Sequence, residues 1–123
     1  MTAKILVADD EQNIVRLLRM YLRNEGYDVV AAADGRQALD RFASESPDLV
    51  LLDLMMPAMN GFDVCTEIRK RSDVPVIMLT ARAQNTDRNR AVTLGVHSYM
   101  VKPFSPIELM ETVEKILGER GCG

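Results

Sequence analysis

Residues 47–61, PDLVLLDLMMPAMNG, decide the fold of this chain. Positions 49–52 are all apolar, whereas a strand with one face in water alternates apolar and polar side chains. A strand that is apolar on both faces is typical of the centre of a parallel sheet covered by helices. The run stops at Asp53, and a loop with a proline and an Asn-Gly turn signal follows it before a helical pattern begins at Phe62. These residues predict a buried central strand with a carboxylate at its carboxyl end.

Four further apolar runs lie on either side of this strand, and amphipathic stretches separate them. The runs cover residues 4–8, 27–33, 75–79 and 98–101, and the stretches with helical spacing cover residues 14–22, 38–42, 62–71, 86–95 and 105–118. Five strands that alternate with five helices predict an α/β fold. The expected architecture is a doubly wound, five-stranded parallel sheet with right-handed crossovers and helices on both faces.

Local signals predict where the helices begin and end. Gly26 is a C-terminal stop for the first helix, and Thr86-Asp87 are candidate caps for the fourth. Ser105-Pro106 combine an N-cap with proline at the first helical position. We expect the last helix to end near Gly118 and residues 119–123 to form a frayed tail.

Length and composition predict one globular domain spanning residues 1–123. Apolar residues make up 47% and charged residues 27% of the chain, and no apolar run is long enough to cross a membrane. The net charge of −3 argues against direct nucleic-acid binding by this domain. Cys65 and Cys122 are far apart and form no CxxC motif, which favours two free thiols in a reducing cytoplasm.

The polar residues that close the apolar runs predict a single site. The first strand ends at Asp9-Asp10, the third at Asp53, the fourth at Thr80 and the fifth at Lys102. In an open parallel sheet, ligands bind beyond the carboxyl ends of the strands, so these side chains share one edge.

Three carboxylates in one crevice repel one another unless a positive charge lies among them. An all-oxygen site with spare positions suits Mg²⁺, which retains waters and binds phosphate oxygens. Lys102 adds an ammonium and Thr80 a hydroxyl. A divalent ion, an ammonium and a hydroxyl around one carboxylate would stabilise an acyl phosphate, because phosphoryl transfer requires mainly positioning and charge neutralisation.

The same residues carry a family resemblance over nearly the whole chain. Asp9-Asp10, Asp53, Thr80 and Lys102-Pro103, in this order and spacing, resemble the receiver domains of two-component response regulators. So do the stretches LLDLMMPAMNGFDVCTEIR, VIMLTAR and YMVKPFSPIEL. The resemblance implies a flavodoxin-like fold of the chemotaxis-regulator kind, with strand order 2-1-3-4-5. It also implies a signalling switch, rather than an enzyme with an external substrate, that is phosphorylated by a sensor histidine kinase or phosphotransfer domain.

Position by position, the resemblance assigns the reacting groups. Asp53 resembles the phospho-acceptor, and Lys102 resembles the residue that pairs with the phosphoryl group. Asp10, Asp53 and the backbone carbonyl of Met55 resemble the Mg²⁺ ligands, with Asp9 acting through water.

The resemblance also implies a switch and a lifetime for the phosphorylated state. Thr80 and Tyr99 resemble the hydroxyl and aromatic ring that rearrange on phosphorylation. Met55 and Arg82 flank the path of the hydrolytic water, and neither is suited to orient or deprotonate it, so we expect slow self-dephosphorylation. A cis peptide bond is expected between Lys102 and Pro103.

One departure from the family pattern concerns the dimer. Receivers of the winged-helix transcription factors pair through the fourth helix, fifth strand and fifth helix. The matching ionic positions here are Arg88, Glu108, His97, Ser98 and Thr112. The first two keep the expected charges, but His97 and Ser98 replace aspartates and Thr112 replaces an arginine, which argues against the standard dimer.

Other readings of these residues are weaker. The acidic run at positions 9–11 alone could be carboxylates favoured at a helix N-terminus, but that does not explain why Asp53 shares their edge. An aspartyl-phosphate phosphatase needs a second Asp two residues after the nucleophile, where this chain has Met55. An FMN-binding flavodoxin needs a phosphate loop after the first strand, where acidic residues would repel phosphate. A scaffold that has lost phosphorylation would usually lack one of the key residues.

Overall fold

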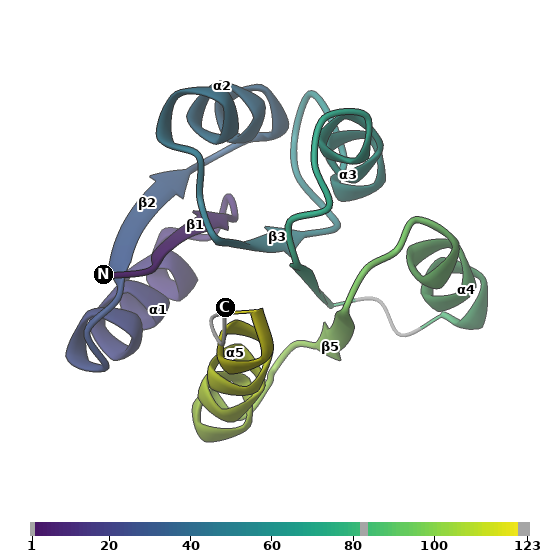
Figure 1. Ribbon diagram of the computed structural model, residues 1–123. Coiled ribbons are helices and arrows are strands. Elements are labelled where there is room, and N and C mark those ends of the chain that lie inside the picture. The colour runs from purple at the N-terminus through teal and green to yellow at the C-terminus, as the bar shows by residue number, and fades with distance from the viewer. Residues whose placement is uncertain (1, 82–83, 121–123) are drawn as a thin grey trace.

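The computed structural model describes residues 2–81 and 84–120, and these form one parallel sheet with helices on both faces (Figure 1). The sheet order is β2-β1-β3-β4-β5. This confirms the predicted flavodoxin-like, doubly wound α/β fold and its strand order 2-1-3-4-5. The strands are β1 (Lys4–Ala8), β2 (Asp28–Ala32), β3 (Leu49–Asp53), β4 (Val76–Thr80) and β5 (Ser98–Val101).

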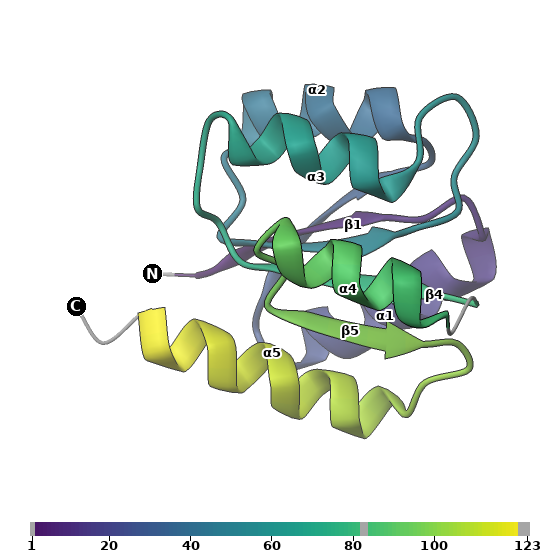
Figure 2. The ribbon, with the colours of Figure 1, turned by 90° about the vertical axis from the view of Figure 1, so that its right-hand side faces the viewer.

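Five helices connect and cover the strands (Figure 2). They are α1 (Gln12–Asn24), α2 (Gly35–Glu45), α3 (Gly61–Arg69), α4 (Asn85–Thr93) and α5 (Pro106–Arg120). The buried side chains of α2, α3 and α4 belong to one apolar cluster, and those of α1 and α5 belong to the other. The sheet therefore separates two cores, as the covered central strand predicted.

Strand β3 illustrates how the sequence builds both cores. All five of its residues are buried. Leu49 and Leu51 pack in the cluster beneath α1 and α5, whereas Val50 and Leu52 pack in the cluster beneath α2, α3 and α4. This alternation follows from the two-residue period of a strand, and burial of both faces explains why no polar residue interrupts the run. Asp53 is the first polar side chain, at the carboxyl edge.

Two helix boundaries differ from the expectation. Helix α4 has its N-cap at Gln84, so Thr86 and Asp87 lie inside its first turn and are not its caps. The Asp87 carboxylate is favourable there because the helix N-terminus is partially positive. Helix α5 continues past Gly118 to Arg120, because an isolated glycine costs about 1 kcal/mol without breaking a helix. The first two residues of the expected tail are therefore helical, and residues 121–123 lie outside the described chain.

Other local predictions are confirmed. Gly26 adopts a φ of +92° just after α1, a conformation that glycine adopts at little cost. The Ser105 hydroxyl accepts a hydrogen bond of 3.3 Å from the backbone N–H of Glu108, with Pro106 as the first residue of α5. None of the helices in the described residues is both long and apolar enough to span a membrane.

Candidate functional site

The polar residues at the strand ends meet at one edge of the sheet, as predicted. Asp9 follows β1 directly, Asp53 and Thr80 are the last residues of β3 and β4, and Lys102 follows β5. The parallel register pairs Asp53 with Leu79 and Thr80 with Val101, so the neighbouring strands end almost level. Side chains distant in sequence are brought together because parallel strands present all their carboxyl ends on the same side.

Three carboxylates form the centre of this edge. Asp9, Asp10 and Asp53 each offer an oxygen within 4.8 Å of the others. Asp9 is 1% exposed and Asp53 is 3% exposed, whereas Asp10 is open to solvent. Two buried carboxylates and one exposed carboxylate leave a solvent-accessible approach to a concentrated negative charge. We call these three residues the acidic cluster.

The Lys102 ammonium neutralises part of this charge. Its Nζ lies 2.7 Å from Asp9 Oδ2, 3.0 Å from Glu11 Oε1 and 3.5 Å from Asp53 Oδ2. The Lys102 side chain is only 9% exposed, so these ion pairs lie in a largely dehydrated site where charge interactions are stronger than at an open surface. Glu11 was not predicted as a site residue; its place directly after Asp9-Asp10 was the available signal.

Backbone groups fix the two buried carboxylates. Asp9 Oδ1 accepts a 2.9 Å hydrogen bond from the Glu11 N–H, and Asp53 Oδ1 accepts a 3.2 Å bond from the Met55 N–H. In both aspartates the second oxygen lies nearer to Lys102. Each side chain is thus held from one side by its own loop and from the other by the ammonium.

Gly61 brings the loop after Asp53 close to the strand end. Its N–H donates a 2.9 Å hydrogen bond to the Leu54 carbonyl. A Cβ at this position would lie 2.6 Å from the Asp53 carbonyl oxygen and 2.8 Å from Leu54 Cα, so only glycine fits without a shift of the backbone. The next helix begins immediately, because the Asn60 side chain accepts a 3.0 Å hydrogen bond from the Asp63 N–H.

Electrostatics make Asp53 the unusual carboxyl of the site. Burial, followed by repulsion from Asp9, raises its pKa from the ordinary value of 3.8 to about 7. Lys102 and the Met55 N–H act in the opposite direction but do not restore an ordinary pKa. For Lys102, burial lowers the pKa, but its hydrogen bonds to Asp9 and Glu11 outweigh burial, and the pKa is raised. The ammonium therefore stays charged at neutral pH, whereas the Asp53 carboxylate is deficient in positive neighbours.

A divalent cation would supply the positive charge that Asp53 lacks. The donor set consists of carboxylate oxygens, with exposed Asp10 as a point of entry, and hard oxygen ligands of this kind suit Mg²⁺. The acidic cluster is consistent with the predicted Mg²⁺ site. A bound cation would also lower the pKa of Asp53, because an adjacent positive charge favours the ionised carboxylate.

The remaining predicted residues differ in burial. Thr80 is fully buried, and Tyr99 is partly buried on the neighbouring strand, opposite Met78. Met55 is 49% exposed. The expected cis bond between Lys102 and Pro103 is confirmed. Arg82 lies outside the described residues.

Comparison with known proteins decides the family. The description "Response regulator receiver domain" applies to a family model that matches residues 5–114. The chain belongs to this family. A receiver domain with an acidic cluster at this edge is the phospho-acceptor switch of two-component signalling, and it implies a histidine kinase as partner.

The relatives that this chain matches include longer regulators. The receiver domain is 54% identical over 114 residues to a "probable transcriptional regulator ycf27" of Porphyridium aerugineum. The aligned stretch covers 93% of this chain and 48% of that protein. The receiver domain is 45% identical over 118 residues to the "alkaline phosphatase synthesis transcriptional regulatory protein PhoP" of Bacillus subtilis (strain 168), covering 95% and 49% respectively. The chain therefore spans about half the length of these curated relatives.

Solved structures show the same fold. A CheY-like response regulator receiver domain protein from Methanospirillum hungatei JF-1 superposes with a TM-score of 0.94 at 28% identity, covering 98% of both chains. The chemotaxis protein CheY4 of Vibrio cholerae superposes with a TM-score of 0.89 at 32% identity, covering 95% of this chain and 100% of that one.

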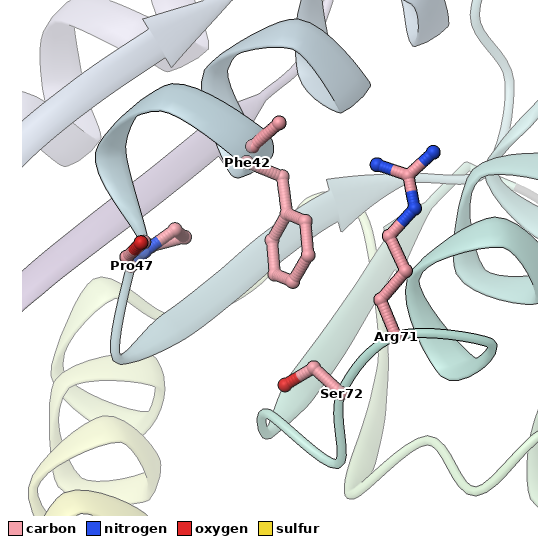
Figure 3. A pocket seen from close by; sticks show the side chains of 6 residues that line it. Phe42, Pro47, Arg71 and Ser72 are labelled. Atoms are coloured by element: carbon pink, nitrogen blue, oxygen red, sulfur yellow. The ribbon is translucent and has the colours of Figure 1, made fainter.

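A hollow elsewhere on the receiver domain is not part of this site. It has a volume of about 280 Å³ and is lined by Phe42, Ala43, Ser46, Pro47, Arg71 and Ser72 (Figure 3). These residues come from the end of α2, the segment between α2 and β3 and the segment between α3 and β4. They lie at the amino ends of the strands, on the opposite edge from the acidic cluster.

Proposed function

We propose that Asp53 of this receiver domain accepts a phosphoryl group from a sensor histidine kinase or a phosphotransfer domain. The observation that carries the proposal is the position of Asp53 at the end of the buried central strand, within 4.8 Å of two further carboxylates and 3.5 Å from the Lys102 ammonium. Asp53 Oδ1 accepts a hydrogen bond from the Met55 N–H and Oδ2 faces the ammonium, which supports Oδ2 as the oxygen that reacts in this proposal.

The reaction is a direct displacement at phosphorus. An Asp53 carboxylate oxygen forms a bond to phosphorus while the bond to the donor nitrogen of the phosphohistidine breaks, and the donor keeps that electron pair. The residues that would hold Mg²⁺ are Asp10, Asp53 and the Met55 backbone carbonyl, with Asp9 acting through water. When bound, Mg²⁺ supplies positive charge to the phosphoryl oxygens.

We propose that Lys102 changes its ion-pair partners during this step. Before phosphorylation its ammonium is closest to Asp9 and Glu11. The phosphoryl group adds negative charge next to Asp53, only 3.5 Å from Nζ, and we propose that Lys102 then pairs with a phosphoryl oxygen. Movement of Lys102 would transmit the phosphorylation of Asp53 to the start of α5.

We propose Thr80 and Tyr99 as the switch pair. Thr80 is buried and ends β4, the strand next to β3 and its terminal Asp53, and we propose that its hydroxyl donates a hydrogen bond to a phosphoryl oxygen. Space vacated by that hydroxyl would let the half-buried Tyr99 ring turn inward. This movement changes the surface formed by α4, β5 and α5.

The output that we propose is gene regulation through a sustained phosphorylated state. Two relatives are described as transcriptional regulators, and the chain matches about half of each. Met55 and Arg82 lack a group suited to activate water, which favours slow self-dephosphorylation. We do not expect the standard dimer through α4, β5 and α5, since His97, Ser98 and Thr112 do not supply the usual charges.

Phosphorylation by a small donor tests the assignment of Asp53. Wild type, Asp53→Asn and Asp40→Asn are incubated with acetyl phosphate and Mg²⁺, and the intact mass is measured. Asp40 is an exposed aspartate on α2 and serves as the matched control. We expect wild type and Asp40→Asn to gain one phosphoryl group and Asp53→Asn to gain none. Labelling of Asp53→Asn at the wild-type rate would show that another residue is the acceptor.

A further inference from the structure

Helix α4 is held to the body of the receiver domain differently from the other helices. It buries a single side chain, Ala91. In α1, by comparison, three large apolar side chains are buried: Val15, Leu18 and Leu22. Val92 of α4 is 70% exposed, and the remaining residues of this helix are polar. Burial of apolar area therefore contributes little to the position of α4.

Two arginine side chains compensate by stacking on aromatic rings. The Arg88 guanidinium carbon lies 4.9 Å from the centre of the Tyr99 ring on β5. The Arg90 guanidinium carbon lies 4.4 Å from the centre of the Phe62 ring on α3. At about 100° per helical residue, these arginines lie on opposite sides of Ala91. They contact the two elements between which α4 lies, as Figure 2 shows.

Arg69 anchors the C-terminal end of α4. At the C-terminal end, Arg69 donates hydrogen bonds of 3.1 Å to the Leu94 carbonyl and 3.0 Å to the Gly95 carbonyl. The same guanidinium also binds the Val74 carbonyl at 2.7 Å, which ties this end to the segment before β4. The C-terminal end of α4 is therefore fixed to the body of the domain through one guanidinium.

The aromatic partners connect α4 to the acidic cluster. Phe62 is buried and follows Gly61, which packs on the backbone of Asp53. Tyr99 is three residues before Lys102, the counter-ion of the cluster. A displacement of the loop after Asp53 would move the Phe62 ring that Arg90 contacts, and a displacement of β5 would move the Tyr99 ring that Arg88 contacts.

We propose that Arg88 and Arg90 are positioning residues that hold α4 against β5 and α3 in the unphosphorylated domain, and that phosphorylation acts on α4 by weakening these two contacts. The second part rests on the function proposed above. Loss of either contact lets α4 shift relative to the element that the arginine contacted, while Arg69 still binds the Leu94 and Gly95 carbonyls. Substitution of Arg88 or Arg90 would remove one of these contacts before phosphorylation and so favour the arrangement of α4 in the phosphorylated domain.

Hydrogen exchange in the unphosphorylated domain tests the holding role. Arg88→Met and Arg90→Met remove the charge and keep a long side chain with similar helix propensity. Arg36→Met, on the exposed face of α2, is the matched control. An exposed cation–π contact is worth ~0.5–1 kcal/mol, so each substitution should speed exchange of α4 amides about two- to fivefold. The amides of β3 should be unaffected, and Arg88→Lys and Arg90→Lys should restore part of the protection.

The rate of labelling by acetyl phosphate tests the coupling. We expect both methionine variants to be labelled about two- to fivefold faster than wild type, and Arg36→Met to match wild type. Unchanged α4 exchange in both variants would overturn the holding role. Faster exchange with unchanged labelling would overturn the coupling to phosphorylation. If wild type takes no label at all, the function proposed for Asp53 fails, whereas the exchange result still decides whether the arginines hold α4.

Discussion

The ammonium of Lys102 lies 2.7 Å from Asp9, and both side chains are almost completely buried. This contact is shorter than the 3.5 Å between Lys102 and Asp53, so the counter-ion of the site is committed mainly to Asp9. Burial and repulsion from Asp9 raise the pKa of Asp53, and Lys102 together with the hydrogen bond from the Met55 N–H does not offset this rise. The unequal sharing of Lys102 makes Asp53 the group whose charge is most easily changed by a cation or by phosphorylation.

The first prediction concerns stability without a divalent cation. Because the pKa of Asp53 is raised to about 7 in the folded state, the fold retains a proton that the unfolded chain loses near pH 4. Stability linked to this group is present below pH 4 and is lost as the pH rises through about 7. Asp53→Asn should therefore stabilise the cation-free domain at pH 8, by roughly 2 kcal/mol, and have little effect at pH 4.

Chemical denaturation with a chelator at both pH values measures this difference. Addition of Mg²⁺ at pH 8 should raise the stability of wild type more than that of Asp53→Asn, because the ion offsets the repulsion. An Asp53→Asn variant that is less stable than wild type at pH 8 would contradict the raised pKa.

Asp10 should be needed for chemistry and not for folding. It is the exposed member of the acidic cluster, so its neutralisation removes repulsion without leaving a buried group unpaired. Asp10→Asn should lose labelling by acetyl phosphate while its melting temperature stays equal to that of wild type or rises. A large drop in melting temperature would show that Asp10 has a structural role instead.

Gly61 should be required for the geometry of the loop after Asp53. A methyl group there meets the Asp53 carbonyl at 2.6 Å and Leu54 Cα at 2.8 Å, and both are backbone atoms with little freedom to move. We expect Gly61→Ala to cost about 1–3 kcal/mol of stability and to slow labelling of Asp53. Gly118→Ala is the control, because a Cβ at that helical position meets nothing within 4 Å and should stabilise the domain by up to ~1 kcal/mol. Equal stability of the two variants would contradict the close approach.

The placement of the site residues was predictable because it depends on the ends of strands. An apolar run marks a parallel strand, and the first polar residue after it marks the edge, so Asp9, Asp53, Thr80 and Lys102 were brought together correctly from the sequence. The strand order itself came from the family resemblance, since periodicity does not specify which strands are neighbours. The start of α4 was misplaced because Thr86 and Asp87 are favourable both as caps and within a first turn.

Contacts between side chains on different elements were not predictable. The bond from Lys102 to Glu11 and the stacking of Arg88 on Tyr99 depend on rotamers chosen by the packed structure. From the sequence, Arg88 was assigned only to an ionic position of the dimer surface. The raised pKa of Asp53 likewise depends on its burial and on repulsion from Asp9, which Lys102 only partly offsets, and spacing along the chain does not encode these effects.

The last prediction concerns the lifetime of the phosphorylated state. Hydrolysis requires a water placed in line with the bond between Asp53 and phosphorus, and Met55 is two residues from that carboxylate. The Met55 side chain is 49% exposed, so it stands at the solvent side of the loop whose N–H binds Asp53. A thioether is a poor hydrogen-bond acceptor and cannot donate, and Arg82, two residues past Thr80, cannot act as a base near neutral pH. We therefore expect slow loss of phosphate from wild type.

Substitution at both positions measures this effect. In Met55→Asn combined with Arg82→Glu, an amide and a carboxylate replace the two side chains and can hydrogen-bond to the attacking water. We expect loss of phosphate at least tenfold faster, about 1.4 kcal/mol in the barrier, because an oriented water regains part of the positioning advantage. Met55→Leu with wild-type Arg82 is the control and should keep the slow rate, since leucine fills similar space without a polar group. Loss of phosphate no faster in the double variant than in wild type would mean that these two side chains do not set the lifetime, and that water reaches the phosphoryl group by another path.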